Sequence, residues 1–253
     1  MIYKFLILII LSVFAAEPTL SQSGTSVPVP NISINVDGLN NGEKDFVLSL
    51  QILAVMTVLT LAPSILVMMT SFTRIIIVFQ FLKQAMGTTN QPPAQLITGL
   101  ALFLTFFVMQ PVFNEANEQG IQPYLREEIT QSQAVDNIVQ PFKKFMLKHV
   151  REEDLGLFIK LSGDEKPATP EEVSIWALIP AFSLSEIRVA FQIGFMLFIP
   201  FLVLDMIIAS TLMSIGMFLL PPQLISLPIK ILLFILVDGW YLIVDSLMKS
   251  ITN

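Results

Sequence analysis

Five charged residues lie inside or at the edges of the two last apolar stretches: Arg188, Asp205, Lys230, Asp238 and Asp245. A charge surrounded by lipid is costly and usually has an opposite charge as its partner. If these stretches form an antiparallel hairpin, facing residues have a constant sum of positions. The Asp205–Lys230 midpoint is 217.5 and the Arg188–Asp245 midpoint is 216.5. The sequence therefore predicts two ion pairs around one turn.

The same charges allow two further interpretations. The shared midpoint is a coincidence if the residues near the ends extend their charged groups to the interface. Asp205 could instead relay protons, although a permanent lysine partner would hold its carboxylate ionised. The cost of an unpaired charge in lipid favours structural pairing.

The predicted turn, residues 213–222, is apolar where a simple hairpin loop would be polar. Its candidate sealing residues are Met213, Met217, Phe218 and Leu219, and its candidate hinges are Gly216, Pro221 and Pro222. Thioether side chains adapt to changing shapes, which suits a deformable seal and equally suits core packing. The sequence leaves these two interpretations open.

The sequence gives little indication that the protein is an enzyme. The single histidine, His149, stands between Lys148 and Arg151 in a charged segment, which predicts a solvated surface residue with no metal or catalytic role. No phosphate-binding loop, metalloprotease helix or nucleophile elbow occurs, so we expect no catalytic residues, cofactor or metal. The absence of cysteine excludes disulfide and thiol-redox chemistry. The 14 basic against 20 acidic residues argue against nucleic-acid binding.

The elements that must position the charges are membrane helices. The chain is 54% apolar and 13% charged, against about 45–50% and about 25% in soluble domains. Four apolar stretches approach or exceed the length of a membrane span, at 46–69, 96–113, 187–212 and 229–248. We expect an all-α, membrane-associated bundle of long, kinked hydrophobic helices arranged as hairpins, with one helical external segment inserted.

The remaining regions divide the chain further. Residues 1–16 are typical of a signal peptide, with Lys4 before a ten-residue apolar core. Residues 17–45 are rich in Ser, Pro, Asn and Gly, which indicates a flexible external arm. The segments 46–113 and 187–253 are then the first helical pair and a second hairpin that contains the apolar loop.

Segment 114–186 carries 7 basic and 13 acidic residues, a net charge equal to that of the whole chain. This concentration of charge predicts a water-facing domain. Apolar spacing predicts a helix over 135–151, with Pro141 near its start, and residues 169–172 have the pattern of a second helix start.

Short loops predict the orientation. Residues 70–95 contain Arg74 and Lys83 and no acid, which predicts a cytoplasmic loop, and the connection 221–230 contains only Lys230. The arm carries a net charge of −3 and is expected outside. Segment 114–186 would then be periplasmic.

Two long motifs resemble those of the FliP family of flagellar type III export-gate proteins. They are residues 180–195 (PAFSLSEIRVAFQIGF) and 228–240 (PIKILLFILVDGW). Residues 70–79 and 99–107 are similar to the same family, so the resemblance covers about 46–250. The leader, arm and long external segment favour the flagellar branch of the family over its injectisome relatives.

The resemblance implies a pore-forming core subunit of the export gate, a pentamer in the bacterial inner membrane at the flagellar basal body. Implied partners are FliQ-like and FliR-like subunits, FlhB-like and FlhA-like components, membrane lipid and unfolded flagellar substrates. The family's methionine-rich gasket has Gly followed by three Met, whereas Gly216 is followed here by Met217, Phe218 and Leu219. The alternative from another class is an ion-coupled transporter or proton-channel subunit that uses Asp205.

Overall fold

The computed structural model describes residues 42–88, 91–163, 169, 172–217 and 221–252. Residues 1–51 and 52–253 form two separate compact units, and the packing described below belongs to the second. The predicted signal peptide, residues 17–41 of the arm, Phe218 and Leu219 lie outside the described residues.

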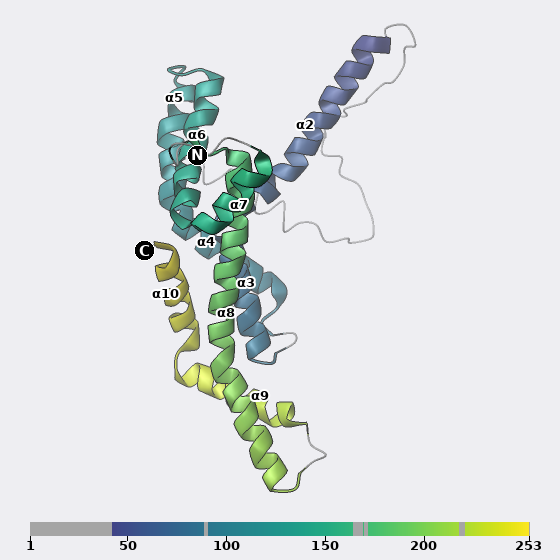
Figure 1. Ribbon diagram of the computed structural model, residues 1–253, viewed down its shortest axis with the longest axis vertical. Helices are drawn as coiled ribbons and strands as arrows, with labels where there is room; N and C mark the ends of the chain where they lie inside the picture. Colours follow the sequence, from purple (N-terminus) through teal and green to yellow (C-terminus); the bar gives the residue numbers. More distant parts are fainter. Residues whose placement is uncertain (1–41, 89–90, 164–168, 170–171, 218–220, 253) are drawn as a thin grey trace, which may run out of the picture. The chain divides into compact units, whose positions relative to one another are not determined.

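Every regular element among the described residues is helical, which confirms the predicted all-α class (Figure 1). The order is α2 (Gly42–Met68), α3 (Phe72–Ala85), α4 (Ala94–Ala116), the π-helix η1 (Asn117–Ile121), α5 (Gln122–Leu125), α6 (Gln131–His149), α7 (Glu152–Ser162), α8 (Ile175–Ser214), α9 (Pro222–Leu236) and α10 (Gly239–Thr252).

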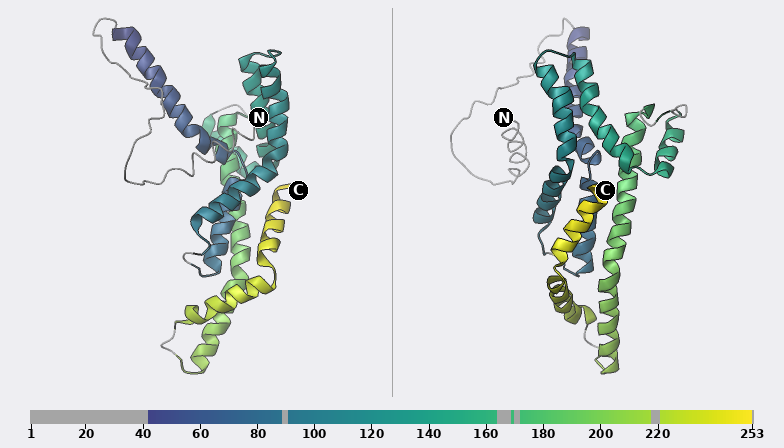
Figure 2. Two further views of the ribbon diagram at one scale, coloured as in Figure 1. Left: turned by 180° about the vertical axis from the view of Figure 1, so that it is seen from behind. Right: turned by 90° about the vertical axis from the view of Figure 1, so that its left-hand side faces the viewer.

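In the part of the chain that the structure describes, three helices are long and apolar enough to span a membrane: residues 49–68 of α2, the continuous helical run 94–125, and α8. The fourth predicted stretch, 229–248, is not one straight helix. It is divided between α9 and α10, which together pass the same test but meet at a bend of 65° (Figure 2). At this bend Asp238 has a φ of 52°, which a continuing right-handed helix does not allow.

Helix α8 begins twelve residues before the expected stretch 187–212 and continues through Pro180 and Pro200. Its first part therefore belongs to the segment predicted to be external. Packing explains this start, because Leu178 and Phe182 are buried against Met146 of α6. A bundle can tolerate a proline in a helix where neighbouring groups bond the freed carbonyls.

The core of the second unit has two parts. One part lies where α3 runs along α8 and meets α4, α9 and α10, with Ile75, Phe79 and Leu82 fully buried. The α3–α8 contact is close because Gly194 faces the Phe81 ring. The other part joins α4, α6 and the first turns of α8.

The predicted external helices are present with shifted starts. Helix α6 begins at Gln131, where Thr130 and Gln133 form a capping box, so Pro141 lies inside the helix and the expectation that it stands near the start was wrong. Residues 170–171 of the second predicted start are not described, and α8 begins at Ile175. The π-helix η1 brings Gly120 against α6, where a Cβ would lie 2.5 Å from Ile138 Cγ1.

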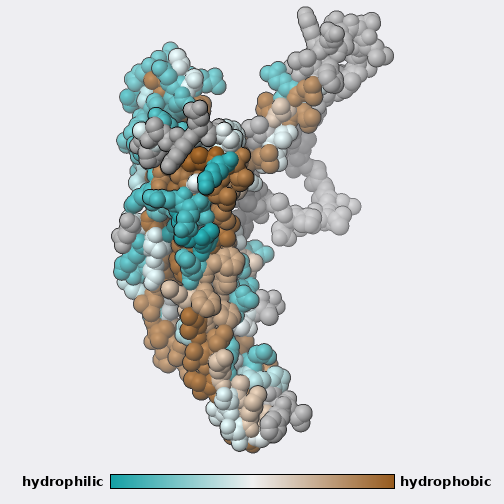
Figure 3. Space-filling model, in the orientation of Figure 1, coloured by the Kyte–Doolittle hydropathy of each residue, from teal (hydrophilic) through white to brown (hydrophobic). Residues whose placement is uncertain are grey.

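The apolar surface remains largely uncovered. Only 11% of the apolar window of α8 and none of that of α2 is buried. Apolar side chains gather over the middle of α8 and hydrophilic ones over α5 and α6 (Figure 3). This surface is available to lipid or to other protein chains.

Candidate functional site

The structure brings Asp205 of α8 and Lys230 of α9 together. Lys230 Nζ donates to Asp205 Oδ2 at 2.6 Å and to the carbonyl oxygen of Ala85 at 3.1 Å. The Lys230 side chain is 7% exposed and that of Asp205 is 40% exposed. Asp205 Oδ1 is buried and has no hydrogen-bond partner among the described residues. The ion pair therefore joins three helices, because Ala85 ends α3.

The second predicted pair is not formed, and the partner expected for Arg188 was wrong. Arg188 Nη2 donates to Asp154 Oδ1 of α7 at 3.1 Å, and Asp245 accepts from Lys249 at 2.8 Å within α10. The constant-sum rule requires two straight antiparallel helices. The bend at Asp238 turns α10 away from that geometry, so the rule holds only as far as Lys230.

Asp154 is the buried centre of a small network between α7 and α8. It is 2% exposed and accepts hydrogen bonds from Ser185 Oγ at 2.8 Å and from Arg188. Ser185 Oγ in turn accepts from the backbone N–H of Arg151 at 3.1 Å. Sequence reasoning missed this network, since Asp154 is one of three consecutive acids that look like an exposed first turn.

A more deeply buried ion pair joins Arg74 of α3 to Glu186 of α8, and sequence reasoning missed it too. The exposed fractions are 4% and 1%. Arg74 Nε donates to Glu186 Oε2 at 2.8 Å, and Arg74 Nη2 donates to Oε1, which makes the pair bidentate. Arg74 Nη1 also donates to the carbonyl oxygen of Ser250 in α10 at 2.7 Å.

The burial of Arg74 corrects the interpretation of residues 70–95. The sequence predicted a cytoplasmic loop because this segment contains two basic residues and no acid, but α3 occupies 72–85 and packs along α8. A guanidinium that is neutralised inside the protein gives no information on orientation, because the positive-inside rule concerns loop charges. Lys83 remains as the basic residue of this segment.

His149 is half-buried, so the prediction of a solvated surface residue was wrong. Its Nδ1 lies 2.8 Å from the carbonyl oxygen of Phe145, and its Nε2 lies 2.9 Å from that of Ile251. Lys148 Nζ donates to the carbonyl oxygen of Thr252 at 3.4 Å. Donors from α3 and α6 thus bond carbonyls in the last turn of α10, which a helix leaves without internal partners.

The connection between α8 and α9 begins with a helix cap. Gly216 has a φ of 83°, its N–H donates to the Met213 carbonyl at 3.0 Å, and the Met217 N–H donates to the Leu212 carbonyl at 3.0 Å. This double pattern is a Schellman motif, which requires the left-handed conformation that glycine adopts without strain. The predicted hinge Gly216 is therefore a hydrogen-bonded helix end.

The predicted sealing residues that the structure describes are exposed. Met213 is 59% and Met217 40% exposed, and Ile215 beside them is 67% exposed. None of the three belongs to the buried clusters. Pro221 precedes α9 in an extended conformation and Pro222 is its first residue, which suits a helix start.

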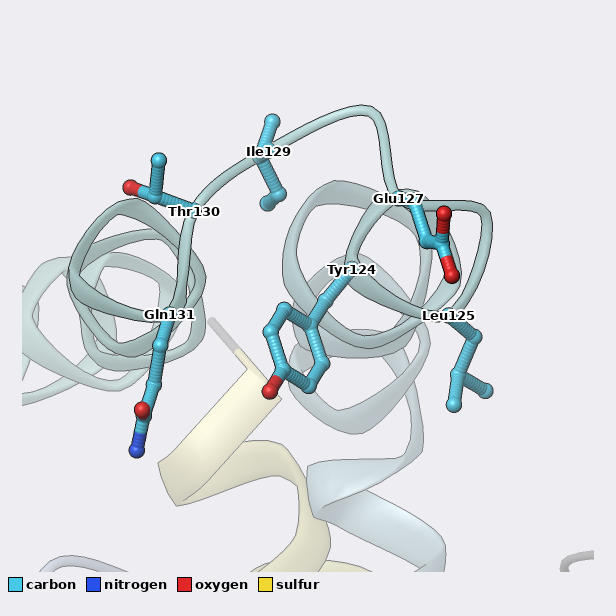
Figure 4. A pocket seen from close by; sticks show the side chains of 6 residues that line it. All are labelled: Tyr124, Leu125, Glu127, Ile129, Thr130 and Gln131. Atoms are coloured by element: carbon cyan, nitrogen blue, oxygen red, sulfur yellow. The ribbon is translucent and has the colours of Figure 1, made fainter.

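A separate hollow of about 440 Å³ lies at the α5–α6 connection (Figure 4). Its lining is Tyr124, Leu125, Glu127, Ile129, Thr130 and Gln131. Tyr124 and Gln131 project to the same side of the connection, and Glu127 is the one carboxylate among the six (Figure 4). Converging acid, base and nucleophile groups, which catalysis requires, are not present among these six side chains.

These features define a class, an all-helical protein with membrane-length apolar helices joined by buried interhelical ion pairs. The model of the FliP family matches residues 55–247. A flagellar biosynthetic protein FliP of Bacillus subtilis is 50% identical over 202 residues, covering 80% of this chain and 91% of the relative. That of Aquifex aeolicus is 46% identical over 224 residues, covering 88% and 92%. The chain belongs to the FliP family.

Proposed function

We propose that this chain is a pore-forming core subunit of the flagellar type III export gate, which admits unfolded flagellar proteins and seals the channel when closed. The observation that carries the proposal is the family match across 55–247, together with relatives that are named flagellar biosynthetic proteins. Under this proposal the chain has no catalytic residues.

The seal is formed by the connection between α8 and α9. Met213 and Met217 expose apolar side chains on both sides of the Gly216 cap, and Phe218 and Leu219 continue the apolar run in the sequence. A ring of such segments from several copies would close a pore with deformable apolar contacts that exclude ions. Pro221 and Pro222 limit how far the segment moves, because their φ angles are fixed.

The gate contains several copies of this chain, five in our proposal, with FliQ-like and FliR-like subunits around the same pore. FlhB-like and FlhA-like components associate with it. The uncovered apolar surface of α8 supports assembly, since the exposed side chains Phe195, Met196 and Met206 would otherwise face only lipid or water.

The complex lies in the bacterial inner membrane at the flagellar basal body, with segment 114–186 on the periplasmic side. The cysteine-free chain permits a direct test of orientation. Asp136→Cys in α6 should react with a membrane-impermeant maleimide added outside spheroplasts, whereas Gln91→Cys between α3 and α4 should react only after permeabilisation. Both positions are exposed. The reverse pattern would overturn the orientation.

The alternative is an ion-coupled transporter or proton-channel subunit that uses Asp205. The observation in its favour is Asp205 Oδ1, which is buried and finds no hydrogen-bond partner within the described segments. Against it, Lys230 binds the other oxygen at 2.6 Å and is itself held by the Ala85 carbonyl, which suits a fixed structural charge. We therefore prefer the gate.

The gate is tested by Met217→Gly with Met217→Leu as the matched control. Both are expressed in a flagellated bacterium that lacks its own FliP. Met217→Gly removes apolar volume from the seal, so ion leakage through assembled gates should rise, while Met217→Leu should stay closed. Unchanged ion leakage through an assembled Met217→Gly gate would contradict the proposal that this segment forms the seal. If a strain without any copy of the chain still exported flagellar subunits, the proposed gate function itself would be contradicted.

A further inference from the structure

Three successive carbonyl oxygens at the end of α10, those of residues 250–252, lie within hydrogen-bond distance of basic side chains. The side chains are Arg74 of α3 at 2.7 Å, His149 of α6 at 2.9 Å and Lys148 of α6 at 3.4 Å. Guanidinium and ammonium groups stay charged near neutral pH, whereas the charge of an imidazole changes between about pH 5 and 8. His149 is therefore the contact of the three that a physiological change of pH can alter.

Both ring nitrogens of His149 face a carbonyl oxygen. Nδ1 lies 2.8 Å from the oxygen of Phe145, one turn earlier in α6, and Nε2 lies 2.9 Å from the oxygen of Ile251 in α10. A neutral imidazole carries one N–H, so its other nitrogen would turn a lone pair toward a carbonyl oxygen. The imidazolium carries an N–H on both nitrogens and donates to both oxygens. The arrangement therefore fits the protonated ring.

Two helix ends also favour a positive charge at this position. His149 is the last residue of α6, and Ile251 lies in the last turn of α10. The C-terminal end of a helix carries a partial negative charge, which stabilises a protonated imidazole placed within the last turn. The ends of both helices meet at one imidazole, so their effects on its charge have the same sign.

Charged groups on the elements packed around this part of α6 neutralise one another in ion pairs. The pairs are Arg74–Glu186 between α3 and α8, Arg188–Asp154 between α8 and α7, Arg151–Glu153 at the start of α7, Lys144–Glu115 between α6 and α4, and Lys249–Asp245 within α10. Lys148 is the adjacent cation and opposes a charge on His149. Its side chain is exposed, where water and salt screen the repulsion. Direct contact with two carbonyl oxygens therefore dominates the balance at the ring.

We infer that His149 is a pH-sensitive bridge between the ends of α6 and α10, which the protonated ring closes and the neutral ring opens. The bridge is complete at acidic pH, where both nitrogens donate, and one contact is lost as the pH rises and the ring becomes neutral. The Phe145 contact is local to α6, so the neutral ring keeps it and releases the Ile251 carbonyl. Arg74 and Lys148 keep their contacts at either pH, so the end of α10 loosens without detaching.

Segment 114–186 is periplasmic under the proposed orientation, so the ring would respond to the pH outside the cytoplasm. The bridge itself does not depend on that placement or on the gate function, because it joins two helices of one chain. It can therefore be tested on the full chain in detergent.

Amide hydrogen exchange at about pH 5.5 and pH 8 tests this inference. Protection of the last turn of α10 is expressed relative to the intrinsic exchange rate at each pH. Opening of this turn should be about five- to tenfold more frequent at pH 8, which is the effect expected for the loss of one hydrogen bond. Equal protection at the two pH values would overturn the inference.

His149→Gln and Lys148→Ala are the paired variants for this measurement. Glutamine does not gain a proton in this range, so His149→Gln should show the same protection at both pH values. Lys148→Ala removes a contact whose charge does not change, so it should lower protection at both pH values and keep the pH response of the wild type. A wild-type response in His149→Gln would assign the effect to another group and overturn the inference.

The ring can also be observed directly, since His149 is the one histidine of the chain. Carbon-13 labelling of histidine, in a chain purified without a histidine tag, gives one ring signal whose chemical shift reports protonation. This signal should change from the imidazolium to the neutral position over the same pH range in which α10 loses protection. A ring that is neutral while α10 keeps its full acid-pH protection would contradict the bridge.

Discussion

Arg74 and Glu186 are 112 positions apart in the sequence and form a bidentate ion pair that is almost completely buried. Removing one partner of such a pair leaves a buried charge, which costs about 3–5 kcal/mol. Glu186→Gln should therefore strongly lower the thermal unfolding midpoint of the detergent-purified protein. The loss should reach α10, because Arg74 also holds the Ser250 carbonyl.

Arg126→Ala is the matched control for this prediction. Arg126 lies 4.0 Å from Glu128, with exposed fractions of 67% and 56%, and such surface pairs contribute about 0–1 kcal/mol. Its unfolding midpoint should stay close to that of the wild type. Equal shifts in Glu186→Gln and Arg126→Ala would show that burial of the Arg74–Glu186 pair does not matter.

If Asp205 and Lys230 form a direct ion pair, exchanging their charges should change assembly of the complex in a specific way. Lys230→Asp should abolish assembly, because two carboxylates then face each other. Adding Asp205→Lys should restore assembly only in part, since an aspartate at position 230 cannot donate to the Ala85 carbonyl as Lys230 does. Co-purification of the complex measures both outcomes, and no recovery in the exchanged variant would argue against direct pairing.

Asp205→Asn separates the structural role from a proton relay. A relay requires that this variant assemble and fail to transport. A structural charge requires that assembly itself be weakened, because Lys230 would remain buried without its anion. The amount of assembled complex and its export of flagellar subunits should be measured in the same membranes.

The sequence could predict the apolar helices and one ion pair because both follow from local pattern. Asp205 and Lys230 flank a single turn, and their pairing needs only that two neighbouring helices run antiparallel. The Arg188–Asp245 prediction failed because the left-handed φ of Asp238 cannot be foreseen from an apolar run. The partners of Arg74 and His149 depend on the direction of α3 and the position of α10, which are set by tertiary packing more than 100 residues away.

The contact of His149 with α10 should protect the last turns of that helix from local opening. His149→Leu removes the contact of Nε2 with the Ile251 carbonyl oxygen, and an unsatisfied, partly buried carbonyl costs about 1–3 kcal/mol. Amide hydrogen exchange in the last turns of α10 should therefore become faster. Lys160→Ala, at an exposed position of α7, is the control and should leave this exchange unchanged. Unchanged protection in His149→Leu would show that Arg74 and Lys148 suffice.

Substitution of Gly216 should lower the stability of the protein through backbone conformation alone, without the loss of any contact. Gly216→Ala forces a Cβ into the left-handed region, which costs about 1–2 kcal/mol, although no atom lies within 4 Å of that Cβ. The matched control is Gly156→Ala in α7, where the space is equally open and the φ is not positive. There alanine should stabilise the helix by about 0.5–1 kcal/mol. Opposite shifts of the unfolding midpoint are expected, and shifts of the same sign would contradict the cap.

Gly194→Ala should destabilise the packing of α3 on α8, and a second substitution, at Phe81, should relieve part of this loss. A Cβ at this position would stand 2.5 Å from Phe81 Cγ and 2.9 Å from Phe81 Cβ, so Gly194→Ala must push α3 away from α8. Overpacking of this kind costs about 1–3 kcal/mol. Gly99→Ala in α4, where no neighbouring atom lies within 4 Å of the added Cβ, should not destabilise the protein.

Adding Phe81→Ala to Gly194→Ala removes the ring that clashes, so the double variant should lose less stability than the two single losses added together. Additive losses would mean that the two side chains do not compete for the same space. The separation of α3 and α8 would then be set elsewhere, by the Arg74–Glu186 and Asp205–Lys230 pairs at the two ends of their contact.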